Sequence, residues 1–152
     1  MPQATAAFAL GLIGGLSIPG RMGCGLISDA IGWQKTVKIS LIGTGAAILA
    51  LPLVTNQWAL IGVMALFGFW HGARAVGVMG LVGQVFRMRA VGQMIGTIIG
   101  AAQLVGAMGP YLAGLLHDYT GSYTTMFVGL GIATILVSFV APRAPTPEEM
   151  EA

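Results

Sequence analysis

The chain has 152 residues, of which 56% are hydrophobic and only 8% are charged, and its formal net charge is +2. A soluble domain carries about 25% charged residues, so this composition excludes a soluble globular protein and predicts an integral membrane protein. The small net charge and the lack of a basic cluster exclude nucleic acid as a partner. The single cysteine, Cys24, excludes an internal disulfide bond.

Four long runs of the sequence contain no Asp, Glu, Lys or Arg: residues 1–20, 39–73, 90–116 and 119–142. A helix needs about 20 mainly apolar residues to cross a bilayer, and the second run is interrupted around Pro52 and Asn56. Continuous apolar runs favour helices over the alternating strands of a membrane barrel. We therefore predict an all-α, polytopic membrane helix bundle with five transmembrane helices, at residues 4–28, 36–54, 58–85, 91–116 and 123–141.

Lysine and arginine are unevenly distributed between the two ends of the predicted helices. They follow the first, third and fifth helices: Lys35, Lys38, Arg87, Arg89 and Arg143. The other two connections contain neither residue. By the positive-inside rule, the N-terminus is expected outside and the C-terminus in the cytoplasm of a multi-pass protein of the cell (inner) membrane. Residues 142–152, rich in proline and glutamate, are expected to form a disordered cytoplasmic tail.

Glycines recur at four-residue spacing inside three predicted helices: Gly11 and Gly15, Gly68 and Gly72, and Gly92, Gly96 and Gly100. Such stripes let helix backbones approach closely in lipid. We favour tight helix packing as their role over a direct part in motion. The pair Gly109–Pro110 removes a backbone hydrogen bond and predicts a kink in the fourth helix.

Arg74 lies near the middle of the third predicted helix, and therefore close to the bilayer midplane. A central arginine costs at least about 2.5 kcal/mol on insertion scales, so it needs a partner, a water-filled cavity or an anionic ligand. We favour a cationic site for an anionic substrate; the alternative is pairing with a backbone carbonyl or with an acidic group absent from the chain. His71 lies one turn earlier on roughly the same face. For His71 a hydrogen bond between helices is favoured, and a proton-linked role in the site is the alternative.

Arg21 also lies below the membrane surface, about 12 Å of helix before Asp29. Arg21, Gly25 and Asp29 share a four-residue spacing on one face. Two interpretations of Arg21 stay open, a functional contact and an interfacial residue that holds helix ends together. For Asp29, placed in the connection after the first helix, the structural role is favoured.

The predicted helices contain no activated nucleophile, no pair of carboxylates and no cluster of metal ligands. The His117–Asp118 pair lacks the further ligands of a metal site, and Ser17 and Ser28 have no nearby base to activate them. We therefore expect no catalytic residues, no metal, no cofactor and no enzymatic activity.

The stretch "GLISDAIGWQK" resembles the cytoplasmic loop motif of the major facilitator superfamily, in which a glycine, an aspartate, a second glycine and basic residues follow one another. Gly25, Asp29, Gly32 and Lys35 match this pattern. The resemblance implies that the charges of Asp29 and Lys35 help to gate the transporter between its halves. It also implies that Gly25 allows close approach and Gly32 a sharp turn.

The stretch "GPYLAGLLHDYTGSY" is similar to the eleventh helix and the following outer loop of the monocarboxylate and oxalate–formate type of this superfamily. The order of motifs then corresponds to helices eight to twelve. In those transporters an arginine at the position of Arg21 engages the substrate carboxylate, so the resemblance makes Arg21 a substrate-binding candidate. Arg74 would lie on helix ten, which lines the central cavity.

The fold that the chain resembles has twelve helices in two halves, with the substrate between them. We therefore expect a C-terminal fragment of a secondary active transporter for small organic anions such as monocarboxylates, shortened by gene fragmentation or a late start codon. Its expected partners are the lipid bilayer, a small anionic solute, and the missing N-terminal half or another membrane chain. The alternatives are a non-transporting membrane scaffold or accessory subunit, and an inactive gene remnant.

Overall fold

The computed structural model describes residues 3–85 and 91–140. These residues form α-helices and one short 3-10 helix: α1 (Gln3–Ile31), α2 (Trp33–Ala50), η1 (Leu51–Leu53), α3 (Gln57–Val85), α4 (Val91–Ala107), α5 (Gly109–Thr120) and α6 (Thr124–Val140). The predicted all-helical fold is confirmed, with α4 and α5 together at the place of the fourth predicted helix. The predicted disordered tail, 142–152, lies outside the described residues, as do Arg87, Arg89 and Arg143.

Four helical segments of the described chain are long and apolar enough to cross a membrane: Leu10–Ile31, Trp33–Leu53, Gln57–Gly83 and Gly92–Thr120. The last helix, α6, is apolar but has only 17 residues. Its length of about 26 Å is slightly shorter than the hydrocarbon core of a typical bilayer.

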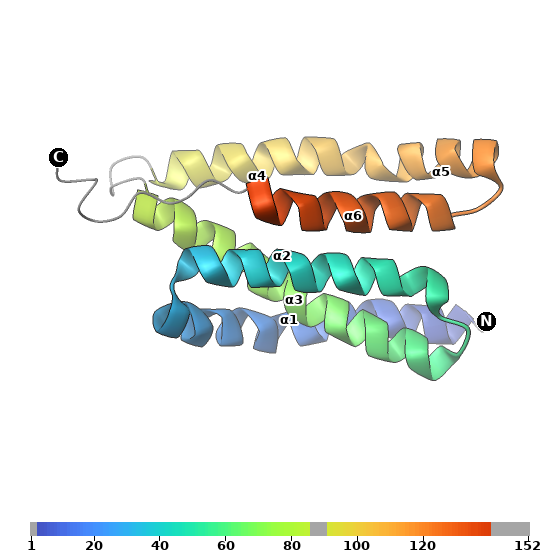
Figure 1. Ribbon diagram of the computed structural model, residues 1–152, viewed down its shortest axis with the longest axis horizontal. Coiled ribbons are helices and arrows are strands. Elements are labelled where there is room, and N and C mark those ends of the chain that lie inside the picture. Colours follow the sequence, from blue (N-terminus) through green and yellow to red (C-terminus); the bar gives the residue numbers. More distant parts are fainter. Residues whose placement is uncertain (1–2, 86–90, 141–152) are drawn as a thin grey trace.

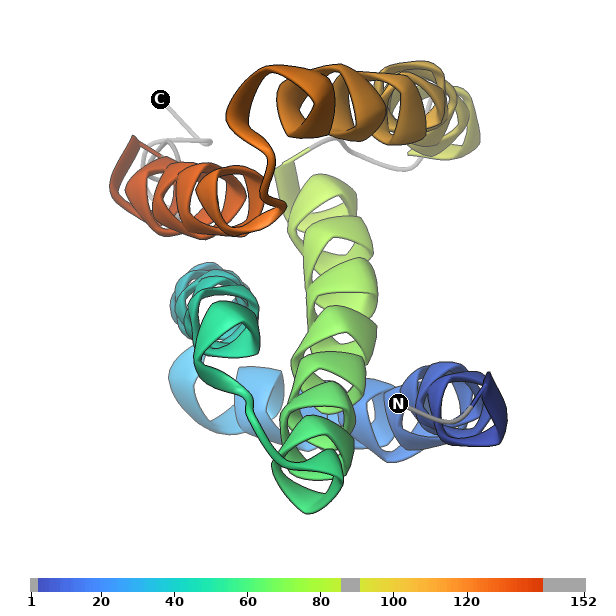
Figure 2. The same cartoon turned by 90° about the vertical axis from the view of Figure 1, so that its right-hand side faces the viewer.

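Helices α1, α2, α3 and α6 pack closely together, whereas α4 and α5 lie on the outside of this group (Figures 1 and 2). Helix α3 packs on both α1 and α2, and α6 packs on α2. The rod formed by α4 and α5 stands beside α6, away from α1. The N-terminal end of α1, the α2–α3 connection and the α5–α6 connection lie at one end of the molecule, and the α1–α2 turn lies at the other.

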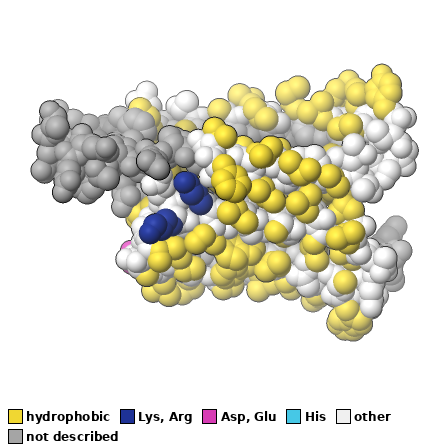
Figure 3. All heavy atoms as spheres, in the orientation of Figure 1, with side chains coloured by type: hydrophobic (Ala, Val, Ile, Leu, Met, Phe, Trp, Pro, Cys, Tyr) yellow, Lys and Arg dark blue, Asp and Glu magenta, His cyan; other side chains and the backbone are white. Residues whose placement is uncertain are grey.

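The surface of the described chain is largely apolar (Figure 3). Leu26, Leu104 and Phe139 are 75%, 76% and 74% exposed. Lys and Arg side chains gather at one end of the visible face, near the α1–α2 turn. A surface of this kind is stable in hydrocarbon rather than in water.

Helices α1 and α3 touch through glycines. A Cβ atom on Gly68 would lie 2.8 Å from the Ile13 Cα, and one on Gly72 would lie 2.7 Å from the Ser17 Cα. Real side chains do not tolerate such distances, so only glycine permits this approach. The Gly68–Gly72 stripe therefore has the packing role that its spacing predicts.

The other two stripes make no such contact within the described residues. Cβ atoms on Gly11, Gly15, Gly92, Gly96 and Gly100 would meet nothing within 4 Å. The expected packing role of Gly92, Gly96 and Gly100 is therefore not found inside this part of the chain. The reason is that α4 stands away from the group formed by α1, α2 and α3.

The connection between α1 and α2 is a single residue, Gly32, whose φ of 86° is accessible mainly to glycine. The predicted sharp turn is present, but the wider predicted connection is wrong. Asp29 lies in the last turn of α1 and Lys35 in the first turn of α2, because helical hydrogen bonding continues almost through the turn. Gly25 has nothing within 4 Å of a Cβ position, so the close approach expected there is not made by the described residues.

The α4–α5 rod is interrupted at Met108, where the Gly109–Pro110 pair begins α5. Pro110 has no N–H to donate to the preceding turn, which explains why the break lies here. The amide of Met108 instead donates to the Val105 carbonyl at 3.2 Å, the tighter pattern of a 3-10 turn. The interruption is therefore at the place that the sequence predicts.

The first prediction concerns the α1–α3 contact. We expect Gly72→Ala to lower the free energy of unfolding by about 1–3 kcal/mol relative to Gly62→Ala, because the new methyl group meets the backbone at Ser17. Gly62 is the matched control, since it lies on the same helix and a Cβ there meets nothing within 4 Å. The measurement is unfolding by sodium dodecyl sulfate in mixed micelles; equal effects of the two substitutions would contradict the contact.

The second prediction concerns the turn. Gly32→Ala forces a methyl-bearing residue into a positive φ and should cost about 1–3 kcal/mol of stability in the same assay. Gly25→Ala is the control because Gly25 lies inside α1 with open space around it. If Gly32→Ala is no less stable than Gly25→Ala, the one-residue turn is incorrect.

Candidate functional site

The crossing of α1 and α3 brings the middles of these two helices together. A Cβ atom on Gly20 would lie 2.9 Å from the carbonyl carbon of Phe69, and the backbones of Gly72 and Ser17 also meet. Arg21 follows Gly20 on α1, and His71 precedes Gly72 on α3. The close contact thus brings together the helix segments that carry Arg21 and His71.

Arg74 and His71 interact directly within α3. The Arg74 Nη2 atom lies 3.4 Å from the His71 Nδ1 atom, a long hydrogen bond across one helical turn. On its other side the His71 ring stacks on Phe67, with ring centroids 5.5 Å apart and planes 24° apart. Phe67 was not singled out by the sequence analysis, although its four-residue spacing from His71 is the signal that could have identified it.

The Arg74 side chain is half-buried, and its Nε atom is buried without a hydrogen-bond partner among the described residues. Buried N–H groups are rarely left unpaired in proteins, because the lost hydrogen bonds to water are costly. Arg74 therefore has hydrogen-bonding capacity that the described part of the chain does not use.

Arg21 contributes a second positive charge to the same region. Its side chain is exposed on α1, and the guanidinium groups of both Arg74 and Arg21 are close enough to act electrostatically on the His71 ring. The structure thus places Arg74 beside His71 and brings Arg21 within electrostatic range of the same ring. Arg21, His71 and Arg74 are called the cationic cluster below.

Asp29 and Lys35, which match the loop motif, lie apart from the cationic cluster. Asp29 is eight residues after Arg21 on α1, about 12 Å along the helix axis. Both side chains are exposed beside the Gly32 turn. They are accessible to another part of the protein at this end of the bundle.

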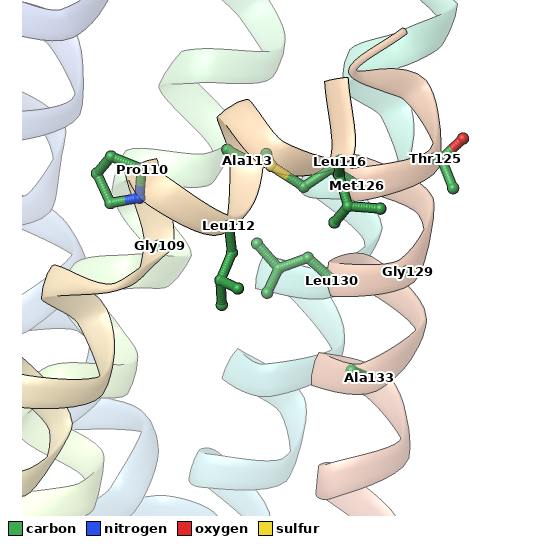
Figure 4. Close-up of a pocket in the computed structure, with 10 residues that line it drawn as sticks. All are labelled: Gly109, Pro110, Leu112, Ala113, Leu116, Thr125, Met126, Gly129, Leu130 and Ala133. Atoms are coloured by element: carbon green, nitrogen blue, oxygen red, sulfur yellow. The ribbon is translucent and has the colours of Figure 1, made fainter. Parts of the chain in front are cut away.

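A separate groove of about 680 Å³ lies between α5 and α6 (Figure 4). Pro110, Leu112 and Leu116 line it from α5, and Met126 and Leu130 line it from α6. Within residues 3–85 and 91–140 no charged side chain lines it, so this part of the chain offers nothing there to neutralise an anion.

The described residues also contain no group of three or more His, Cys, Asp or Glu side chains that could hold a metal ion. His117 instead stacks on Tyr123, with ring centroids 4.4 Å apart. This contact connects the last turn of α5 to the residue that precedes α6.

Comparison with known proteins gives a family and several distant relatives. Residues 1–151 match the Major Facilitator Superfamily. The chain is 31% identical over 129 residues to the MFS transporter asaE of Aspergillus flavus, covering 84% of this chain and 29% of that protein. It is 28% identical over 127 residues to human monocarboxylate transporter 10, covering 82% of this chain and 25% of that protein.

A third relative, monocarboxylate transporter 12 of Xenopus laevis, is 26% identical over 139 residues, covering 89% of this chain and 30% of that protein. The chain therefore spans less than a third of the length of these relatives. No solved structure matches it significantly. Because the family match extends over nearly the whole sequence, the chain belongs to the major facilitator superfamily, whose members are multi-pass integral membrane transporters and not enzymes.

Proposed function

We propose that the chain is the C-terminal part, helices eight to twelve, of a secondary active transporter for small organic anions such as monocarboxylates. The observation that carries this proposal is the cationic cluster at the α1–α3 crossing, near the middle of two apolar helices. The monocarboxylate transporters among its relatives support the class of substrate.

In this proposal the two guanidinium groups bind the substrate carboxylate. Arginine presents several N–H donors in a planar fork that matches the two oxygens of a carboxylate. Away from bulk water, such charge-assisted bonds are stronger than at a solvated surface. The half-buried Arg74 has Nη–H donors besides the one directed at His71, and Arg21 is exposed on the facing helix.

The transport cycle would follow from rocking of two helix bundles around the bound anion. Asp29 and Lys35 would contribute to the gate, since both are exposed at the end of the bundle where α1 meets α2. The remaining helices would come from an N-terminal half or from another membrane chain. The unoccupied glycine stripes of α1 and α4 provide faces on which such helices could pack.

The same unoccupied stripes also favour a second candidate, a non-transporting scaffold or accessory subunit that packs on another membrane protein. The two candidates differ in one measurement, uptake of labelled lactate and pyruvate by membrane vesicles from cells with and without the chain. Uptake that depends on the chain and on Arg74 supports the transporter. Uptake that is unchanged when the chain is deleted contradicts the transporter, and copurification of the chain with another membrane protein then supports the accessory role.

The third prediction tests anion binding directly. In lipid nanodiscs we expect Arg21→Gln and Arg74→Gln each to weaken lactate binding about ten- to a hundredfold, because each removes a charge-assisted hydrogen bond. Equilibrium dialysis with labelled lactate provides the measurement.

Two controls accompany that experiment. Lys38→Gln removes the same charge from α2, near the Gly32 turn, and should bind lactate like the unchanged chain. Lactamide, which has the shape of lactate without its charge, should not compete. Lactate binding that survives both arginine substitutions would remove the cationic cluster as the substrate site.

The fourth prediction concerns orientation, with an outer N-terminus and a cytoplasmic C-terminus in the cell (inner) membrane. Cys24 is the chain's single cysteine, so Cys24→Ser gives a background for single-cysteine labelling. In intact cells a membrane-impermeant maleimide should label Asn56→Cys and Ser122→Cys, whereas Lys35→Cys should react only after the membrane is opened. The reverse pattern would mean that the N-terminus is cytoplasmic.

A further inference from the structure

His71 is held from two sides within α3. Its ring stacks on Phe67, with centroids 5.5 Å apart, and its Nδ1 atom lies 3.4 Å from the Arg74 Nη2 atom. Phe67 is one turn before His71 and Arg74 is nearly one turn after it, so all three side chains lie along one face of α3. The stack fixes the plane of the imidazole, and the plane determines where its nitrogen atoms point.

The chemistry of the two groups determines the protonation of His71 in this contact. Arginine has five N–H donors and no acceptor, so the hydrogen bond requires Nδ1 to accept. An imidazole that accepts at Nδ1 is neutral and carries its proton at Nε2. A protonated imidazole donates at both nitrogens and would repel the guanidinium.

The charged groups that act on His71 from the described elements are Arg74 on its own helix and Arg21 on α1. Neither arginine can accept a hydrogen bond from the ring, which fits an imidazole that accepts rather than donates at Nδ1. The other neighbour, Phe67, carries no charge. Geometry and hydrogen-bonding chemistry therefore agree on one form of the side chain.

We propose that His71 is a positioning residue for Arg74. The neutral, Nε2-protonated ring accepts a hydrogen bond from Arg74 Nη2 and so fixes the direction of the half-buried guanidinium, whose remaining Nη–H groups are then oriented to donate to an anion. This inference rests on the proposed function and deepens it. In it His71 orients Arg74, which binds the substrate, and does not itself contact the substrate.

A pair of substitutions separates this role from simple packing. His71→Phe keeps an aromatic ring over Phe67 but has no acceptor, and His71→Asn loses the ring but can place an amide oxygen near the position of Nδ1. We expect His71→Phe to weaken lactate binding in nanodiscs about tenfold and His71→Asn to weaken it less than about threefold. The reverse order, or equal effects, would show that the ring acts by packing and would overturn the proposal.

A spectroscopic measurement tests the hydrogen bond without any anion. In the chain labelled with ¹⁵N-histidine, His117→Gln leaves His71 as the remaining histidine. Nuclear magnetic resonance should show a neutral ring with an unprotonated Nδ1, whose resonance moves when Arg74 is replaced in Arg74→Met. A ring protonated at Nδ1, or an Nδ1 resonance unaffected by Arg74→Met, would refute the positioning role. Since no ligand is needed, this result is independent of whether the chain binds lactate.

Discussion

The close contact between the backbones of α1 and α3 is the constraint on which the rest of the site depends. In lipid no hydrophobic force draws two apolar helices together, so their association relies on close van der Waals packing. Gly68 and Gly72 allow this packing against Ile13 and Ser17. A larger residue would separate the helices and move Arg21 away from the two polar side chains of α3. The same glycines thus determine both the packing of the bundle and the distribution of its charge.

The cationic cluster is unusual because it concentrates positive charge where the surroundings are apolar. An arginine at the centre of a membrane helix is costly in the absence of a compensating group. Part of the guanidinium is satisfied by His71, but its Nε is not satisfied within the described chain. A carboxylate would supply both the missing acceptor and the missing negative charge. The apolar groove between α5 and α6 would supply neither, because only uncharged residues line it.

Much of the fold follows from the sequence, because bilayer thickness limits the possible structures. Long runs without charge predict the helices, and the Gly109–Pro110 pair predicts the interruption at Met108. Arg21, His71 and Arg74 could each be identified as candidates, since charge inside an apolar helix requires explanation. Local patterns are sufficient for these features.

Features that depend on neighbouring helices could not be predicted. The three glycine stripes have the same spacing in the sequence, yet in the described chain Gly68 and Gly72 meet another helix while the stripe of α4 does not. Spacing shows that a helix can be approached closely, but only the tertiary arrangement determines whether another helix does so. The proximity of Arg21 to His71 is unpredictable for the same reason, because it depends on how α1 crosses α3.

The Gly32 turn has a mechanical consequence. The Gly32 amide donates to the Ser28 carbonyl at 2.8 Å, and the Thr36 amide donates to the Gly32 carbonyl at 3.1 Å. These hydrogen bonds link the end of α1 directly to the start of α2, with only one residue between the two helices. A tilt of α1 must therefore displace the first turn of α2, and with it Lys35. A displacement of α1 near Arg21 would therefore be transmitted along the helix to the charged end of the bundle, because no flexible loop separates α1 from α2.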